Sequence, residues 1–379
     1  MNKAGLYFHI PFCLKKCAYC DFCSFSGCDE AQMRAYTDAL VKEMSHYAKR
    51  AEGAVFDTVF FGGGTPTLLP EDAVSRLIDT ARALFCVAPD AEITLEANPA
   101  TADEKKLSSL RKAGVNRLSV GVQSLSDEEL LYLGRLHSAK EATEFVKTAR
   151  RAGFENLNVD LMYGIPAQTL KSAEETLFAV LDLLPTHISA YSLMLEEGTP
   201  LYEKRATLPI PTEEMEDEID TLVSSTLVKH GYGHYEISNY AKPGMESRHN
   251  LHYWHSDPYL GFGISAYSYF GGVRYGNHTD LLSYVQDPVC AVSEREAVTE
   301  EDLAYEWIML RLRLKEGVSL FEYRARFGVD LKQRHFTAVN GFLSQGLMRE
   351  EDGHLFLTER GFRLSNSILV AFLTDEKNS

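Results

Sequence analysis

Short apolar runs alternate with longer amphipathic segments over the first half of the chain. The apolar runs have the length of strands, whereas the segments between them repeat apolar residues every three or four positions, as helices do. The predicted strands span residues 5–10, 58–61, 92–96, 117–121, 156–160 and 187–192. The predicted helices span residues 30–50, 71–85, 102–113, 139–152 and 170–184. This alternation is typical of βαβ units around a parallel sheet, and six units predict an α/β fold with an open, partial (β/α)6 barrel.

The pattern changes after residue 199. Three prolines between residues 200 and 211 interrupt the alternation, and a charged amphipathic helix is predicted over residues 212–230. Proline removes a backbone donor and fixes φ, so it ends regular elements. A loop rich in His, Tyr, Gly and Asn is then expected to about residue 277.

The end of the chain carries a third pattern. From residue 300 the sequence predicts two helices, a ribbon of two short strands and a final helix. The last four of these elements span residues 331–345, 347–349, 354–357 and 358–372. Their order is typical of a winged-helix-like module, although a plain α+β cap on the barrel would contain the same elements. The expected domains are a barrel (1–200), a connecting region (201–295) and a C-terminal α+β domain (296–379).

Length and charge narrow the range of functions. The chain has 379 residues and a net charge of −16, and chains longer than about 250–300 residues exceed a single hydrophobic core. Surfaces that bind nucleic acid are basic, so this charge argues against a nucleic-acid partner. Met1 to Gly5 do not begin a signal peptide, and no run of about eighteen apolar residues predicts a membrane span. We expect a cytosolic protein whose thiols stay reduced.

Five of the seven cysteines lie close together near the N-terminus. Cys13, Cys17 and Cys20 form a Cys-x3-Cys-x2-Cys arrangement shortly after the first predicted strand. Thiolates are soft ligands that favour iron–sulfur clusters, zinc or copper(I). Three thiolates can hold three corners of a cubane cluster and leave its fourth iron open to a small molecule. The alternative is a structural zinc site, for which the candidate fourth ligands are Cys23, Cys28 and His9.

A glycine-rich run, GGGTPT at residues 62–67, follows the second predicted strand. Glycines let a ligand approach the backbone closely, and exposed amides there can bind its charged ends. Polar residues also follow the next strands, at the C-terminal rim where barrel enzymes build their sites. These residues are Glu96, Asn98, Gln123 and Asp160, with Arg135 expected on the helix after Gln123.

The cysteine arrangement, with Tyr19 directly before the third cysteine, resembles the signature of the radical S-adenosylmethionine (SAM) superfamily. The resemblance implies a [4Fe-4S] cluster on Cys13, Cys17 and Cys20, with the amino and carboxylate groups of SAM bound to the open iron. It also implies an electron donor such as a flavodoxin or ferredoxin. Lys15 and Lys16 could guide an acidic donor, although solvated loop lysines are the plainer interpretation.

Four longer runs resemble the oxygen-independent coproporphyrinogen III oxidase family. The runs are YFHIPFC (7–13), GGGTPT (62–67), GVQ (121–123) and NVDLMYGIP (158–166). The resemblance covers residues 4–195 well and the remainder more loosely. It implies a SAM pocket made by Tyr7, Gly63, Gly64, Thr65, Glu96 and Arg135. It implies a second SAM position at Tyr19, Gln123, Asp160 and Met194.

Two departures from that family point to a sister group, the HemW-type heme chaperones. The oxidases carry a longer segment before the cluster strand, whereas this chain has twelve residues before Cys13. They also have a cysteine two positions after the third ligand, where this chain has Phe22 and then Cys23. In addition, RHNLHYW at residues 248–254 resembles the His-Asn-x-x-Tyr-Trp motif of that group.

The His-Asn-x-x-Tyr-Trp motif implies heme contact through His249. A neutral imidazole is a common axial ligand of heme iron. His252 and His255 are competing candidates that the sequence does not rank. Without the resemblance, the motif would be interpreted as aromatic anchors that attach a loop to the barrel mouth.

Two functions follow from these resemblances. The first is a heme chaperone that binds heme and transfers it to an acceptor protein, with the cluster and SAM controlling oligomerisation or release. The second is an enzyme of coproporphyrinogen type, in which the SAM radical leads to oxidative decarboxylation of propionate side chains to vinyl groups. The short N-terminal segment and the motif favour the chaperone. The expected cofactors are a [4Fe-4S] cluster, SAM and heme, and no catalytic residue is assigned.

Overall fold

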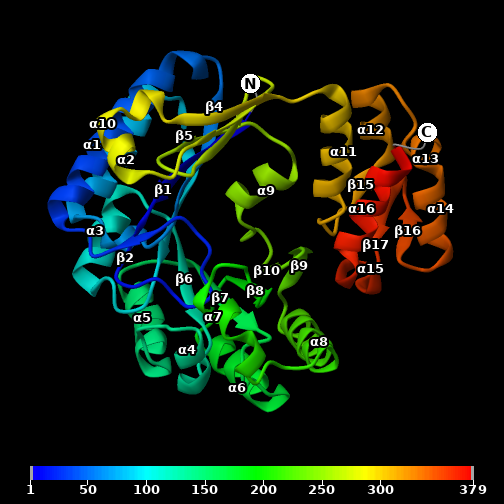
Figure 1. Ribbon diagram of the computed structural model, residues 1–379, viewed down its shortest axis with the longest axis horizontal. Helices are drawn as coiled ribbons and strands as arrows, with labels where there is room; N and C mark the ends of the chain where they lie inside the picture. The colour runs from blue at the N-terminus through cyan, green and yellow to red at the C-terminus, as the bar shows by residue number, and fades with distance from the viewer. Residues whose placement is uncertain (1–2, 377–379) are drawn as a thin grey trace.

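Seven parallel strands form the centre of one large curved sheet in the described part of the chain (Figure 1). The computed structural model describes residues 3–376, so Met1 and Asn2, where no signal peptide was expected, lie outside it. Six of these strands are the predicted ones, and they lie side by side in chain order. Their bounds are β1 (Lys3–Ile10), β4 (Val55–Gly63), β5 (Val87–Ala97), β6 (Arg117–Gln123), β7 (Asn156–Tyr163) and β8 (His187–Ser192). The expected α/β fold with an open barrel is confirmed.

Helices connect the strands and cover the outer face of the barrel (Figure 1). They are α1 (Glu30–Tyr47), α2 (Glu71–Leu84), α3 (Glu104–Ala113), α4 (Asp127–Tyr132), α5 (Ala139–Arg151) and α6 (Leu170–Leu181). Gly114 ends α3 with φ of 115°, a left-handed conformation that glycine adopts without a Cβ clash. No bounds were predicted for the short helix α4, although a helix was expected after Gln123.

Strand β6 shows how the barrel separates its two faces. All seven of its residues are buried, and apolar and polar side chains alternate along it. Leu118, Val120 and Val122 belong to the hydrophobic core. The residues between them face the interior of the barrel, because side chains in a strand point alternately to opposite faces. The same sequence therefore provides a packed outer layer and a polar inner wall.

The sheet continues on both sides beyond the predicted strands. One side adds β11 (Tyr259–Phe262), β12 (Tyr267–Phe270), β13 (Val273–Asn277) and β14 (Val292–Ala297), and the other adds β10 (Asn239–Ala241) and β9 (Gly233–Glu236). β11 pairs with β1 in parallel, and the other additions are antiparallel.

The expectation of a loop up to about residue 277 was therefore wrong. The strands in this region are three to five residues long, and their glycines suggested a loop. One of these glycines serves close packing instead, because a Cβ on Gly261 would lie 2.1 Å from the carbonyl oxygen of Tyr267. The helix predicted before this region is present as α8 (Glu213–Lys229).

The C-terminal segment has its own small sheet and its own hydrophobic core. Its helices are α11 (Glu300–Arg311), α12 (Leu320–Phe327), α13 (Leu331–Arg334), α14 (Phe336–Ser344), α15 (Glu359–Arg363) and α16 (Ser365–Glu376). Its strands are β15 (Val318–Ser319), β16 (Met348–Glu351) and β17 (His354–Leu357). The predicted order of helices and ribbon is present, but the helix expected over 331–345 is divided at His335, and the last one is divided at Leu364. Among the described helices, none is long and apolar enough to cross a membrane.

Candidate functional site

One cavity inside the barrel gathers most of the predicted site residues. We call it the lumen; its volume is about 590 Å³, within the range of about 300–1,000 Å³ typical of small-molecule sites. The predicted residues that line it are Cys13, Cys17, Tyr19, Cys20, Gly63, Gly64, Glu96, Asn98, Gln123, Arg135, Asp160 and Met194. Other lining residues were not singled out in the sequence: Arg117, Ser119, Asn158, Ser189 and Tyr191 are among them. Their signal was the polar alternation within strands, which a search at the strand ends overlooks.

The three motif cysteines lie on a loop at one end of the lumen. Two short parallel strands, β2 (Phe12–Cys13) and β3 (Phe25–Ser26), join the two sides of this loop. The Thr65 hydroxyl donates to Cys13 Sγ at 3.7 Å, and Arg135 Nη1 donates to Cys17 Sγ at 3.4 Å. Burial, followed by the charges of the other two cysteines, raises the pKa of the Cys20 thiol.

This donor set fits a cluster better than a single ion. Within residues 3–376, no three His, Cys, Asp or Glu side chains converge as the ligands of one metal ion would. The thiolates of a [4Fe-4S] cluster each bind a different iron, so they stand farther apart than the ligands of a zinc ion. The side chains considered as a fourth zinc ligand, Cys23, Cys28 and His9, do not line the lumen. Three half-buried thiols that face one lumen are what a cluster with an open iron requires.

The cysteine loop is held from behind by strand β1. His9 Nε2 donates to the carbonyl oxygen of Cys23 at 2.8 Å, and the Tyr7 hydroxyl donates to His9 Nδ1 at 3.1 Å. Tyr7 and Thr65 are thus near the loop but do not line the lumen. Burial keeps the pKa of His9 below its ordinary value and that of Tyr7 above it, so both groups are neutral at pH 7.

The glycine run packs against the cysteine loop. The amides of Gly64 and Thr65 donate to the carbonyl oxygens of Ile10 and Phe12, each at 2.8 Å, and the Gly63 amide donates to Glu96 at 3.1 Å. The expectation that these amides are exposed was therefore wrong, because all three already have protein acceptors. Glycine is needed because a Cβ on Gly64 would lie 2.7 Å from the carbonyl oxygen of Phe12.

Arg135 connects the cysteine loop to the strand ends. It lies just beyond α4, rather than on a helix as expected. Its guanidinium donates to Cys17 Sγ, to Asn98 Oδ1 and, at 2.5 Å, to the carbonyl oxygen of Gly121. This cation therefore reaches from strands β5 and β6 to the thiols.

Two carboxyl groups lie deeper in the lumen. Burial, followed by repulsion from Asp160, raises the pKa of Glu96 to about 8. Burial also raises the pKa of Asp160, which accepts hydrogen bonds from Asn158 Nδ2 at 2.6 Å and from the Ser119 hydroxyl at 3.4 Å. Gln123 ends β6 with φ of 69°, which is strained for a residue with a side chain.

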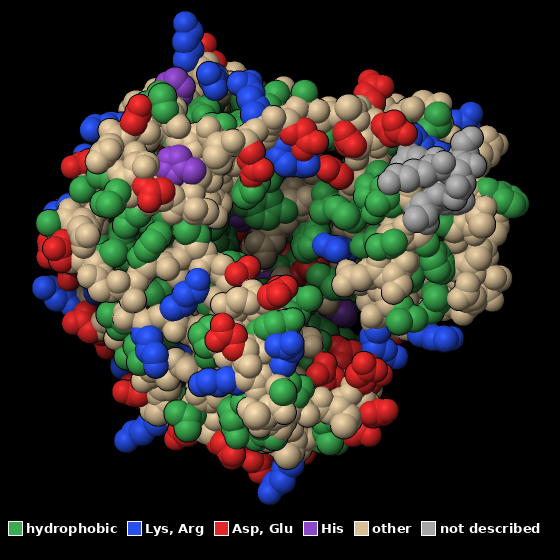
Figure 2. All heavy atoms as spheres, viewed as in Figure 1, with side chains coloured by type: hydrophobic (Ala, Val, Ile, Leu, Met, Phe, Trp, Pro, Cys, Tyr) green, Lys and Arg blue, Asp and Glu red, His purple; other side chains and the backbone are tan. Residues whose placement is uncertain are grey.

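Helix α9 (Arg248–Trp254) carries the His-Asn-x-x-Tyr-Trp motif and lies between the barrel and the C-terminal segment (Figure 1). Asn250 of this helix lines the lumen, so the lumen extends from the cysteine loop to the motif. Figure 2 shows a hollow in the same region, with acidic side chains along part of its rim. The two features predicted separately from the sequence therefore face one cavity.

His249 is buried beneath α9 rather than presented to the lumen. Its Nδ1 is 2.8 Å from the Thr58 hydroxyl, and its Nε2 is 2.8 Å from the Tyr253 hydroxyl. Burial lowers its pKa to about 3, so the ring is neutral at pH 7. Heme ligation by His249 stays a prediction, and it requires one of these hydrogen bonds to break.

The two competing histidines are also engaged. His252 bridges two carboxylates, with Nε2 2.7 Å from Asp57 and Nδ1 2.9 Å from Asp257. Although burial alone would lower its pKa, these two partners raise it to about 9. His255 Nε2 lies 2.9 Å from Glu316 of the C-terminal segment. Neither ring lines the lumen.

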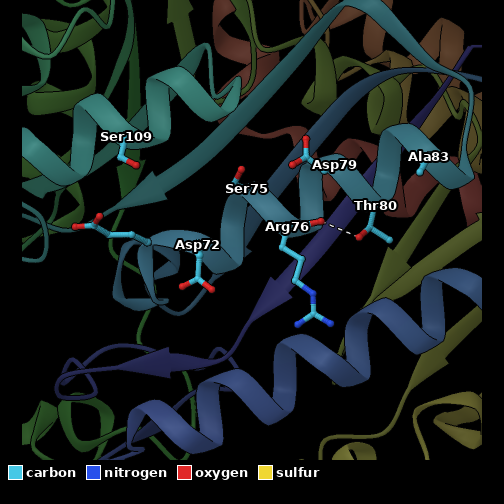
Figure 3. A pocket seen from close by; sticks show the side chains of 8 residues that line it. Asp72, Ser75, Arg76, Asp79, Thr80, Ala83 and Ser109 are labelled. Atoms are coloured by element: carbon cyan, nitrogen blue, oxygen red, sulfur yellow. Dashed lines mark hydrogen bonds between the residues drawn. The ribbon is translucent and has the colours of Figure 1, made fainter.

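A second, shallower groove lies on the outside of the barrel (Figure 3). It runs along α2 and is lined by Glu71, Asp72, Ser75, Arg76, Asp79, Thr80, Ala83 and Ser109. Arg76 points toward α1 in the close-up, where it pairs with Asp38 at 2.5 Å. None of the predicted site residues lines this groove, and we assign it no role.

Known proteins are similar to this chain over nearly its whole length. Residues 7–180 match the family described as the radical SAM superfamily, and residues 298–364 match the HemN C-terminal domain. The heme chaperone HemW of Bacillus subtilis is 37% identical over 97% of this chain and 98% of its own. The heme chaperone HemW of Escherichia coli is 35% identical, with 98% of each chain covered. Among solved structures, the coproporphyrinogen III oxidase HemN of Escherichia coli has a TM-score of 0.86 at 26% identity, over 98% of this chain and 90% of that one.

Proposed function

Because the chain belongs to the family of the heme chaperone HemW, we propose that it binds heme and transfers it to an acceptor protein, with the help of a [4Fe-4S] cluster and SAM. The observation that carries this proposal is the similarity to HemW proteins, which extends over 97% of the chain. The lumen supports it, because the cysteine loop and the motif helix α9 lie at its two ends.

The cluster would be held by Cys13, Cys17 and Cys20. When bound, it supplies an iron that can chelate SAM and an electron that can cleave it. Arg135 would offset part of the negative charge of these thiolates, since its guanidinium already donates to Cys17. His9 would fix the loop through its hydrogen bond to Cys23.

SAM would occupy the lumen beside the cysteine loop. Gly63, Gly64 and Glu96 would face its methionyl part, with Tyr7 and Thr65 supporting that wall from behind. A protonated Glu96 can donate a hydrogen bond, whereas its ionised form can accept one from an ammonium group. The lumen residues Tyr19, Gln123, Asp160 and Met194 would surround the remainder of the cavity, where a second SAM was predicted.

Heme would bind toward α9, with His249 as the candidate ligand and His252 and His255 as alternatives. Ligation by His249 Nε2 would release the Tyr253 hydroxyl, which now lies 2.8 Å away. The acceptor protein and an electron donor such as a flavodoxin or ferredoxin are the expected protein partners, and a cytosolic location remains our expectation.

A second candidate function is oxidative decarboxylation of coproporphyrinogen III. It is favoured by the structural similarity to the HemN oxidase, whose 26% identity is nevertheless below the 31–37% of the HemW relatives. We therefore place it second.

The test of the proposal is heme titration of the anaerobically reconstituted full chain. We expect saturable binding of one heme per chain, weakened by His249→Ala but not by His255→Ala, with thermal melting as a check that each variant folds. No release of carbon dioxide is expected from coproporphyrinogen III with SAM and a reductant. Failure to bind heme, together with decarboxylation, would favour the second function.

A further inference from the structure

Arg117 is a buried cation with no direct partner. Arg117 is 2% exposed and lines the lumen from the first position of β6. Its Nε is buried and has no hydrogen-bond acceptor in residues 3–376. Arg135, the other lumen arginine, instead donates to three protein acceptors.

An arginine in this situation is costly for the folded protein. The guanidinium stays charged at any physiological pH and has five donors. A buried charge without a paired or hydrogen-bonded counter-group is strongly destabilising. The carboxyl groups of Glu96 and Asp160 lie near enough to attract this cation electrostatically, but neither accepts a hydrogen bond from it in the described residues.

A second polar atom beside Arg117 is also unused. Thr94 is the residue paired with Arg117 across strands β5 and β6. Its hydroxyl is fully buried and has no hydrogen-bond partner in the described residues. Two neighbouring donors without acceptors indicate that an acceptor from outside the chain belongs here.

The position of Arg117 separates it from the cluster. It lies four residues before Gly121, the carbonyl of which accepts from Arg135. At about 3.3 Å per strand residue, their Cα atoms are roughly 13 Å apart. A SAM whose carboxylate is bound to the cluster therefore does not present that carboxylate to Arg117.

The lumen as a whole suits a largely apolar ligand with one acidic group, and Phe60 is the apolar lining residue nearest to Arg117, through Thr94 of β5. Phe60, Met162 and Tyr191 provide apolar surface in the same lumen. The paired N–H donors of a guanidinium match the geometry of both carboxylates and phosphates. A phosphate dianion is disfavoured, because the lumen also holds the carboxyl groups of Glu96 and Asp160.

We propose that Arg117 anchors a carboxylate of the ligand that fills the inner part of the lumen, namely a propionate side chain of heme. The assignment of the carboxylate to heme rests on the proposed function. The guanidinium would donate to the two carboxylate oxygens.

The experiment compares heme with its dimethyl ester, in which both propionates are esterified. Each is titrated, in the same detergent, into the reconstituted full-length wild type and Arg117→Gln. We expect Arg117→Gln to weaken heme binding at least tenfold and the ester to bind wild type at least tenfold more weakly than heme. Because both changes remove the same contact, Arg117→Gln should bind heme and ester with nearly equal affinity. SAM affinity should be unchanged.

Arg151→Gln is the matched control, since it removes the same charge from the outer face of α5 and should leave heme binding unchanged. If Arg117→Gln does not fold, Arg117→Lys replaces it, with a reduced preference for heme over ester expected.

Three results would overturn the inference and leave the proposed function standing. They are normal heme binding by the folded Arg117→Gln variant, equal binding of heme and ester by wild type, and a variant that loses only SAM affinity. Absence of heme binding by wild type would overturn both.

Discussion

Single side chains fix the cysteine loop from several directions. Thr65 and Arg135 contact the thiols, and His9 binds the loop backbone at Cys23. The loop is therefore attached to the strand ends through side chains as well as through its short strands. Such attachment favours a defined ligand geometry before any cofactor binds.

The first prediction at this scale concerns the cluster. Cys17→Ser should lose the broad brown absorbance at about 400 nm after anaerobic reconstitution, because a hydroxyl is a poor substitute for a thiolate iron ligand. Iron and sulfide analysis should fall in parallel. Cys86→Ser, a change at an exposed thiol, should keep the full absorbance. An intact cluster in Cys17→Ser would show that the ligand assignment is wrong.

The second prediction concerns Gly64. In Gly64→Ala the new methyl group would meet the backbone oxygens of Phe12 and Ile10, at 2.7 and 2.8 Å, and backbone atoms cannot move aside cheaply. We expect a loss of about 2 kcal/mol or more in the free energy of unfolding, together with reduced cluster content. Gly341→Ala is the control, because its Cβ meets nothing within 4 Å and it lies inside α14. That change should stabilise the chain slightly, and denaturant unfolding measures both.

At the scale of elements, α9 is held to the barrel by charge rather than by a large apolar face. Its first two amides donate to the Glu92 carboxylate at 3.2 Å, as expected at a helix N-terminus. Arg248 and His252 both pair with Asp57. The motif helix is therefore attached through groups that respond to pH.

This attachment predicts a pH-dependent stability. The pKa of His252 is raised to about 9 in the folded chain, against about 6.5 when unfolded. The contribution of His252 to the free energy of unfolding is fully present below about pH 6.5 and is lost as pH rises through about 9. Its upper limit is about 3 kcal/mol. His252→Gln should therefore be markedly less stable than wild type at pH 6 and much closer to it at pH 10. Urea unfolding at both pH values provides the test, and a gap that is constant with pH would contradict it.

At the scale of the whole molecule, the C-terminal segment covers an edge of the large sheet. The amide of Lys315 donates to the carbonyl oxygen of Tyr235 at 3.0 Å, and Leu314 forms a bridge with Glu236. These contacts protect β9, the last strand of the sheet, from pairing with another chain. Ile237, in the turn after β9, packs against the C-terminal core.

Ile237→Ala should loosen this contact. The side chain is partly buried, so we expect a loss of about 1–2 kcal/mol, below the cost at a fully buried site. Limited proteolysis between β14 and α11 should become faster. Val228→Ala, a change at an exposed position of α8, is the control. Unchanged cleavage would mean that other contacts hold the segment.

Much of this protein was determined by local sequence. The alternation of apolar runs and amphipathic segments predicted the six barrel strands, because each run must bury one face wherever the chain places it. The cysteine spacing and the strand-end positions of Glu96, Gln123 and Asp160 predicted one common site, and the lumen brings those residues together. These features could be predicted because they depend on residue type and short spacing.

The tertiary structure decided what depends on distant partners. β11 pairs with β1, more than 240 residues earlier in the chain, and its four residues alone gave no strand signal. Both nitrogens of His249 are occupied by Thr58 and Tyr253, which a motif cannot reveal. Arg117 Nε has no acceptor in the described residues because the acids of the neighbouring strands, Glu96 and Asp160, accept from other donors. Local sequence sets what each residue can do, whereas long-range pairing sets which groups it meets and whether its charge and hydrogen bonds are satisfied.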